Sequence, residues 1–374
     1  MSPKKFIPVS HPVFSGNEKK YALECLDSVW ISSIGKFIPL FEKKFAEFCG
    51  VEHAVSTCNG TSALHLALLG LGVLPGDEVL VPTLTYISVA NAVRYCGATP
   101  RFVDSEARTF NLDPTQIEDK ITSKTKGIIA VHLYGHPADM DAILEIARRR
   151  GLFVLEDAAE SPGAMCRGRM VGGLGDAAIF SFFGNKIVTT GEGGMVMTHN
   201  AELSDRIRIL RGQGMDPNHR YWFPVVGYNY RMTNLEAAIG LAQTEQIEEH
   251  IASRRRVAEW YNQRLEPLRE FLTLPIEEPW ARHSFWMYTV VLKDTVRLER
   301  DAVIGGLAAG GIETRPVFYP MHVLPPYKEA DGRYPVAEAL ARRGINLPTH
   351  GLLTEEDVDY IAASLRTLCE SRRT

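Results

Sequence analysis

The chain has 374 residues, of which 45% are hydrophobic and 23% are charged, and its formal net charge at pH 7 is −4. These values are typical of a globular protein that is long enough for more than one domain. The acidic balance excludes the broad basic surface that nucleic-acid binding requires, so we expect no nucleic-acid partner.

The termini and the cysteines indicate where the protein works. The first residues lack the apolar core of a signal peptide, and no apolar run approaches the roughly 20 residues that a membrane span needs. Six scattered cysteines, without metal-ligand spacing, predict thiols in a reducing compartment. His132 and His136 flank a turn without a Cys or carboxylate at ligand spacing, which favours a role in shaping that loop. We therefore expect a cytoplasmic protein with no membrane segment and no metal site.

Short apolar runs alternate with amphipathic stretches between residues 50 and 200. The runs at 78–81, 127–131, 152–155 and 178–182 are apolar at consecutive positions, as in strands that helices cover on both faces. Residues 137–150 carry apolar side chains at helical spacing. The alternation predicts an α/β domain with a mainly parallel central sheet.

The pattern changes after residue 234, where a long helical stretch reaches to about residue 268. Residues 286–292 then read as a strand, and short helical segments follow. We expect a large α/β domain over residues 1–254 and a smaller α+β domain over residues 255–374. Ligands of open α/β sheets bind beyond the carboxyl ends of the strands, so the chemistry is expected in the loops there.

Residues 58–64 (CNGTSAL) follow an apolar run and open a predicted helix. Gly60 allows close approach of the backbone, and Thr61 or Ser62 can cap the helix. Free N–H groups at a helix N-terminus bind phosphate, although many helices begin in this way only for the cap. Taken alone, this segment favours the cap.

The predicted strand before residue 158 ends in two carboxylates, Glu156 and Asp157. Neighbouring residues of a strand point to opposite faces, so one of the two is expected to face the site. Such a carboxylate can bind a metal, act as a base, hold a protonated heterocyclic nitrogen or cap a helix.

Lys186 lies just after the buried strand at 178–182, and the glycine-rich turn GEGG follows at 191–194. Burial lowers the pKa of a lysine and makes the neutral amine available as a nucleophile for a Schiff base. Position alone does not assign that role, because most lysines are exposed.

The three segments occur in the order of the cofactor site in fold-type I pyridoxal-phosphate (PLP) enzymes. The chain resembles the sugar-nucleotide aminotransferase family from about residue 30 to residue 322. The similar segments are GTSALHLAL (60–68), GDEVLVPTLTYISVANAV (76–93), VHLYGHPADMD (131–141), EDAAES (156–161), TTGEGGMV (189–196) and GYNYRMTNLEAAIG (227–240). The resemblance implies a PLP-dependent transaminase, and the lysine at position 186 favours amino transfer over the dehydration that relatives with His there perform.

The resemblance also implies a role for each matching residue. Lys186 would bind PLP as a Schiff base and move the proton, Asp157 would pair with the ring nitrogen, and Tyr86 would stack on the ring. The remaining matches are Gly60, Thr61 and Ser181 at the phosphate, Glu160 at the ring hydroxyl where Gln or His is common, and Asn229 reaching the phosphate from a second subunit. This last match implies a homodimer with a shared active site.

The segments FFGNK (182–186) and 211–234 look most like those of family members that use GDP-4-keto-6-deoxymannose, with L-glutamate as amino donor. Candidate substrate contacts are Arg220, Tyr319 and His322, while Arg231 would fix a loop or bind the donor carboxylate. Two alternatives stay open: an aminotransferase for a UDP- or dTDP-linked 4-keto or 3-keto sugar, and a binding or regulatory protein that keeps the PLP fold without turnover.

Overall fold

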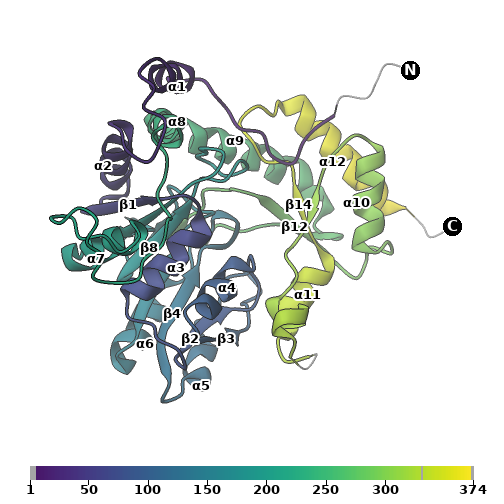
Figure 1. Cartoon of the computed structure of the whole chain (residues 1–374). Coiled ribbons are helices and arrows are strands. Elements are labelled where there is room, and N and C mark those ends of the chain that lie inside the picture. Colours follow the sequence, from purple (N-terminus) through teal and green to yellow (C-terminus); the bar gives the residue numbers. More distant parts are fainter. Residues whose placement is uncertain (1–5, 330–331, 372–374) are drawn as a thin grey trace.

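The computed structural model describes residues 6–329 and 332–371 (Figure 1). Within these residues, the largest sheet has seven strands. Their order across the sheet is β1 (His53–Thr57), β9 (Gly194–Thr198), β8 (Ala177–Ser181), β5 (Phe153–Asp157), β4 (Thr125–Val131), β2 (Glu78–Pro82) and β3 (Thr99–Val103). The pairs from β8 to β3 are parallel, whereas β9 is antiparallel to both of its neighbours. The predicted mainly parallel sheet is confirmed.

Helices cover both faces of this sheet, which explains why its strands are apolar at consecutive positions. Val79 and Val81 pack into the core that includes α3 (Gly60–Gly70) and α4 (Ser88–Tyr95), while Leu80 between them packs into the core that includes α6 (Met140–Arg150). The helices of this part are α1 (Glu18–Asp27), α2 (Phe37–Cys49), α3 (Gly60–Gly70), α4 (Ser88–Tyr95), α5 (Ile117–Lys120), α6 (Met140–Arg150), α7 (Ala201–Arg211) and α8 (Asn234–Glu245). Because successive side chains of a strand point to opposite faces of the sheet, helices on both faces are needed to bury apolar residues at consecutive positions.

Helix α6 illustrates how the sequence sets the ends of a helix. It begins at Met140, three residues later than the sequence pattern suggested, because the Asp139 side chain accepts a hydrogen bond from the N–H of Ala142 and caps the helix. It ends at Arg150, and the next residue, Gly151, caps it with a φ of 64°, in the left-handed region that favours glycine.

A second core lies beside the large sheet. Its four-stranded sheet has the order β10 (Leu272–Thr273), β12 (Tyr288–Leu292), β14 (Gly344–Leu347) and β13 (Arg315–Pro316). Figure 1 shows α10 (Arg300–Ala309), α11 (Pro335–Arg343) and α12 (Glu355–Glu370) near β12 and β14. Helix α9 (Ile247–Leu265) contributes Val257 and Tyr261 to this core, and Ile7 also packs there. The predicted domain boundary at 254/255 falls inside α9 and stays a prediction.

Three short strands form a third sheet in the order β11 (Ala281–Arg282), β6 (Met165–Cys166) and β7 (Arg169–Met170). All six cysteines are free thiols. None of the helices in the part of the chain that the structure describes is long and apolar enough to cross a membrane.

Candidate active site

A cavity of about 480 Å³ lies beyond the carboxyl ends of the large sheet. Val131, Asp157 and Ser181 are the last residues of β4, β5 and β8, and all three line it. Parallel strands end at one edge, so residues far apart in the sequence meet there. Seven of the predicted site residues line the cavity: Gly60, Thr61, Tyr86, Asp157, Glu160, Ser181 and Lys186. Their individual roles stay predictions.

The N-terminus of α3 forms one wall of the cavity. The helix is capped by Asn59, whose side chain accepts a hydrogen bond from the N–H of Ser62, and not by Thr61 or Ser62 as the sequence suggested. A Cβ atom at Gly60 would lie 2.9 Å from the Cβ of Ser181, so the close approach of α3 to β8 requires glycine. Gly60 and Thr61, both in the first turn of α3, therefore line the cavity beside Ser181.

Asp157 and Glu156 have separate environments, as the alternation along β5 predicts. Asp157 lines the cavity, and its Oδ1 accepts a hydrogen bond from the N–H of Ala159 at 3.0 Å. Glu156 is fully buried on the other face.

Glu156 stabilises the turn at residues 172–175 by accepting hydrogen bonds from its backbone. Its carboxylate accepts hydrogen bonds from the N–H groups of Gly172, Leu174 and Gly175, and it lies 3.0 Å from Nε2 of His132. The N–H of Ala138 donates to Nδ1 of His132, so Nε2 carries the hydrogen and donates to Glu156. His132 therefore shapes the loop that follows β4.

Lys186 and Glu160 form a buried pair in the cavity, with Nζ 3.7 Å from the carboxylate of Glu160. Burial lowers the pKa of Lys186, while Glu160 and Asp157 oppose that shift. Nζ also lies 3.9 Å from the ring centroid of Trp286. Burial thus favours the neutral amine, the form that acts as a nucleophile, whereas the two carboxylates and the ring of Trp286 favour the charged form.

The pKa of Glu160 is raised toward neutral pH by its buried environment. Burial raises its pKa to about 7, while the charge of Lys186 and the N–H of Tyr134, which donates to Glu160 at 2.8 Å, lower it. The charge of Asp157 adds to the rise. In the folded protein Glu160 thus keeps a proton that an unfolded glutamate loses at a lower pH.

This shift predicts a pH-dependent stability for the protein without added ligand. Between the unfolded and folded pKa values the folded state binds more protons, so the free energy of unfolding falls as pH rises through that window. From about pH 5 to about pH 7, wild type should lose on the order of 1–3 kcal/mol relative to Glu160→Gln. Urea unfolding of both proteins across this range measures the difference, and parallel pH curves would contradict the shift.

The other predicted residues lie outside the lining of this cavity. Asn229 is exposed, and its Oδ1 accepts hydrogen bonds from Nε and Nη2 of Arg231 at 3.3 and 3.1 Å. Arg220 is exposed beside the ring of Tyr221. Asn229 and Arg220 thus share the segment between α7 and α8.

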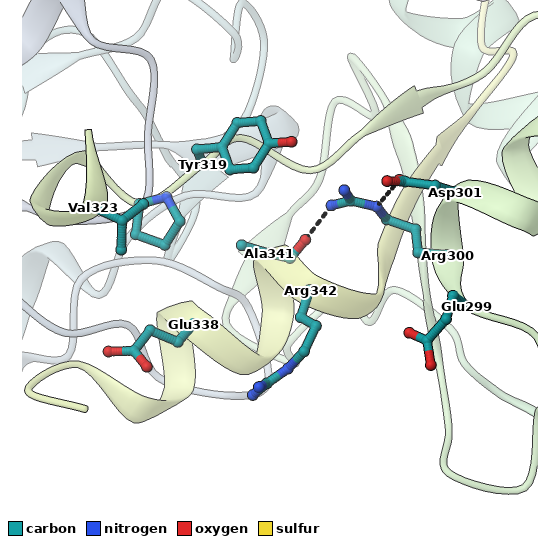
Figure 2. Close-up of a pocket in the computed structure, with 9 residues that line it drawn as sticks. Glu299, Arg300, Asp301, Tyr319, Val323, Glu338, Ala341 and Arg342 are labelled. Atoms are coloured by element: carbon teal, nitrogen blue, oxygen red, sulfur yellow. Dashed lines mark hydrogen bonds and ion pairs between the residues drawn. The ribbon is translucent and has the colours of Figure 1, made fainter. Parts of the chain in front are cut away.

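Tyr319 lines a second pocket, together with Arg300 at the start of α10 and Ala341 in α11 (Figure 2). His322 is fully buried, with Nδ1 2.6 Å from Oγ1 of Thr83 and Nε2 3.3 Å from Glu338. Both ring nitrogens are therefore engaged inside the protein. The structure does not bring His322 to the cavity as the sequence analysis expected, because the imidazole links Thr83, directly after β2, to Glu338 of α11.

Sequence reasoning missed several residues of the cavity wall. Six of them come from the part of the chain after residue 285 and reach the cavity only through the tertiary fold: Trp286, Met287, Arg315, Pro316, Phe318 and Asn346. No spacing pattern links these residues to Lys186.

A model of the DegT/DnrJ/EryC1/StrS aminotransferase family matches residues 13–366. The chain belongs to this family.

Two GDP-perosamine synthases are similar to this aminotransferase over nearly their whole length. That of Caulobacter vibrioides is 57% identical over 98% of this chain and 99% of its own, and that of Escherichia coli O157:H7 is 50% identical over 96% and 98%. Spr1654 of Streptococcus pneumoniae, solved in its PLP form, is 28% identical, covers 98% of this chain and 99% of its own, and has a TM-score of 0.93. The predicted family, fold class and transaminase activity are confirmed.

Proposed function

We propose that this aminotransferase uses PLP to move the amino group of L-glutamate to C4 of GDP-4-keto-6-deoxy-D-mannose. The products would be GDP-perosamine and 2-oxoglutarate. The similarity to two relatives named GDP-perosamine synthase, at 57% and 50% identity over nearly the whole chain, carries this proposal. The cavity around Lys186 and Asp157 supports the chemistry.

The cavity residues fit PLP. The cradle between Gly60 and Ser181, which a Cβ atom would fill, suits the phosphate group at the start of α3. Asp157 suits the ring nitrogen, and the amine of Lys186 suits the aldehyde. When bound, PLP supplies the aldehyde that takes up the amino group and a ring that withdraws electrons from the neighbouring carbon.

The residues of the chain supply the proton chemistry. Nζ of Lys186, whose pKa is lowered by burial, would in its neutral form take the proton from the carbon that bears the amino group of L-glutamate. The same amine would later return a proton to C4 of the sugar, so one lysine serves both halves of a ping-pong reaction. The carboxylate of Asp157 would keep the proton on the ring nitrogen, and Glu160 would contact the ring hydroxyl.

The proposal includes a homodimer in which Asn229 reaches the phosphate of the partner's cofactor. The segment before Asn229 exposes Tyr221, Trp222, Phe223 and Val226. Exposed apolar side chains of this size suit burial against a second copy. We place the enzyme in the cytoplasm, where its product would supply bacterial surface polysaccharide such as the O-antigen of lipopolysaccharide.

Turnover with different keto sugars tests the substrate. We expect kcat/KM to be at least about tenfold higher for GDP-4-keto-6-deoxymannose than for UDP- or dTDP-linked 4-keto or 3-keto sugars, which corresponds to about 1.4 kcal/mol of discrimination. A higher value for a UDP- or dTDP-linked sugar would replace this substrate with that one. Absence of turnover with every keto sugar and amino donor would favour a binding protein that keeps the fold.

A further inference from the structure

Arg315 lies in the wall of the active-site cavity but has no role in the chemistry proposed above. It belongs to β13, where it pairs with Asn346 of β14, and both residues line the cavity. Asn346 is held by Thr289, whose Oγ1 donates to Oδ1 of Asn346 at 2.6 Å. The second core therefore fixes the backbone that presents Arg315 to the cavity.

The charged groups around the cavity indicate that a cation other than Lys186 is needed to bind a carboxylate of the donor. Among the described lining residues, Asp157, Glu160 and Glu192 carry carboxyl groups, whereas Lys186 and Arg315 carry basic groups. L-Glutamate brings two further carboxylates, and a carboxylate that leaves water without a partner is costly. Lys186 has to be neutral to react, so it cannot also serve as that partner. Arginine stays protonated and offers a planar fork that matches a carboxylate.

The present partner of Arg315 is loosely held. Nη2 of Arg315 lies 3.6 Å from Oε1 of Glu313, and the two side chains are 46% and 37% exposed. Ion pairs that are this open contribute little, and strong charge-assisted hydrogen bonds are shorter, at about 2.7–2.9 Å. Glu313 is held independently, because its Oε2 accepts a hydrogen bond from the N–H of Val9 at 3.0 Å. Arg315 can thus turn to an incoming anion while Glu313 stays in place.

We propose that Arg315 binds a carboxylate of the amino donor and so sets the preference for an acidic amino acid. This inference rests on the proposed function, since it assigns the donor site of the same cavity. In the second half-reaction the keto sugar brings no carboxylate, and its anionic pyrophosphate is attached at C1, across the sugar ring from the reacting C4. Arg315 is therefore expected to matter for the donor and not for the sugar.

The test compares wild-type holoenzyme with Arg315→Gln. Glutarate, a dicarboxylate without an amino group, reports donor binding by calorimetry, and steady-state kinetics give a separate KM for each substrate. We expect the Kd for glutarate and the KM for L-glutamate to rise about 10- to 100-fold, the range for a lost charge-assisted pair. The KM for the keto sugar should change less than about twofold.

Two matched variants keep the test specific. Arg366→Gln, at an exposed arginine of α12, should leave glutarate binding unchanged. Glu313→Gln keeps an acceptor for Val9 and removes the competing charge, so glutarate should bind at least as tightly as to wild type. Weaker glutarate binding in Glu313→Gln, or equal losses for donor and sugar in Arg315→Gln, would overturn the assignment.

The outcomes also separate this inference from the function on which it rests. If wild type turns over L-glutamate while Arg315→Gln binds glutarate as tightly as wild type, the assignment of Arg315 is wrong and the function stands. If wild-type holoenzyme does not accept the amino group of L-glutamate, the proposed donor itself is wrong.

Discussion

Lys186→Ala is expected to lower the rate of amino transfer by about 10⁴-fold, because it removes both the nucleophile and the group that moves the proton. The side chain lies in the cavity and is not part of the surrounding cores, so the fold and the first turn of α3 should remain. Single-turnover kinetics with L-glutamate measure the loss. Circular dichroism and thermal unfolding check the fold.

Lys186→Arg provides the matched control for charge. Arginine keeps a cation beside Glu160 but cannot become a neutral amine, so this variant should be as inactive as Lys186→Ala. Lys126→Ala, at an exposed lysine of β4, should retain full activity. Near-normal turnover in Lys186→Ala would refute the mechanism.

Asp157→Asn is expected to slow amino transfer by about 10²- to 10³-fold, the range for loss of one fixed electrostatic partner at a reacting centre. The amide oxygen can still accept the hydrogen bond from Ala159, so the turn after β5 should be preserved. Rapid-mixing kinetics of the half-reaction give the rate, and denaturant unfolding should show a stability change below about 1 kcal/mol. A variant with wild-type rates would show that Asp157 serves only as a cap.

The sequence predicts the elements that short-range patterns specify. The apolar runs predict β2, β4, β5 and β8, because strands covered on both faces need apolar residues at every position. The same reading brings Asp157 and Lys186 to one edge of the sheet, since the ends of parallel strands meet there.

Residues joined only by the tertiary fold could not be predicted in this way. Thr83 and His322 are 239 positions apart, and no local pattern indicates that the imidazole fills a buried position between two segments. Arg315 likewise reaches the cavity because β13 pairs with β14. A strand of two residues is too short to give a sequence pattern from which this pairing could be predicted. Asn59 caps α3 because its backbone is extended, as an N-cap residue requires. Asn, Thr and Ser are all common N-cap residues, so the sequence alone does not show which of Asn59, Thr61 and Ser62 takes this position.

The absorbance spectrum of the purified protein supplied with PLP, recorded before and after addition of L-glutamate, tests the central proposal most directly. We expect a long-wavelength band from cofactor bound at Lys186, its loss when L-glutamate donates its amino group, and its return on addition of GDP-4-keto-6-deoxymannose. A protein that shows no such band, or whose band does not respond to any amino donor, would contradict the account and favour a binding protein with this fold.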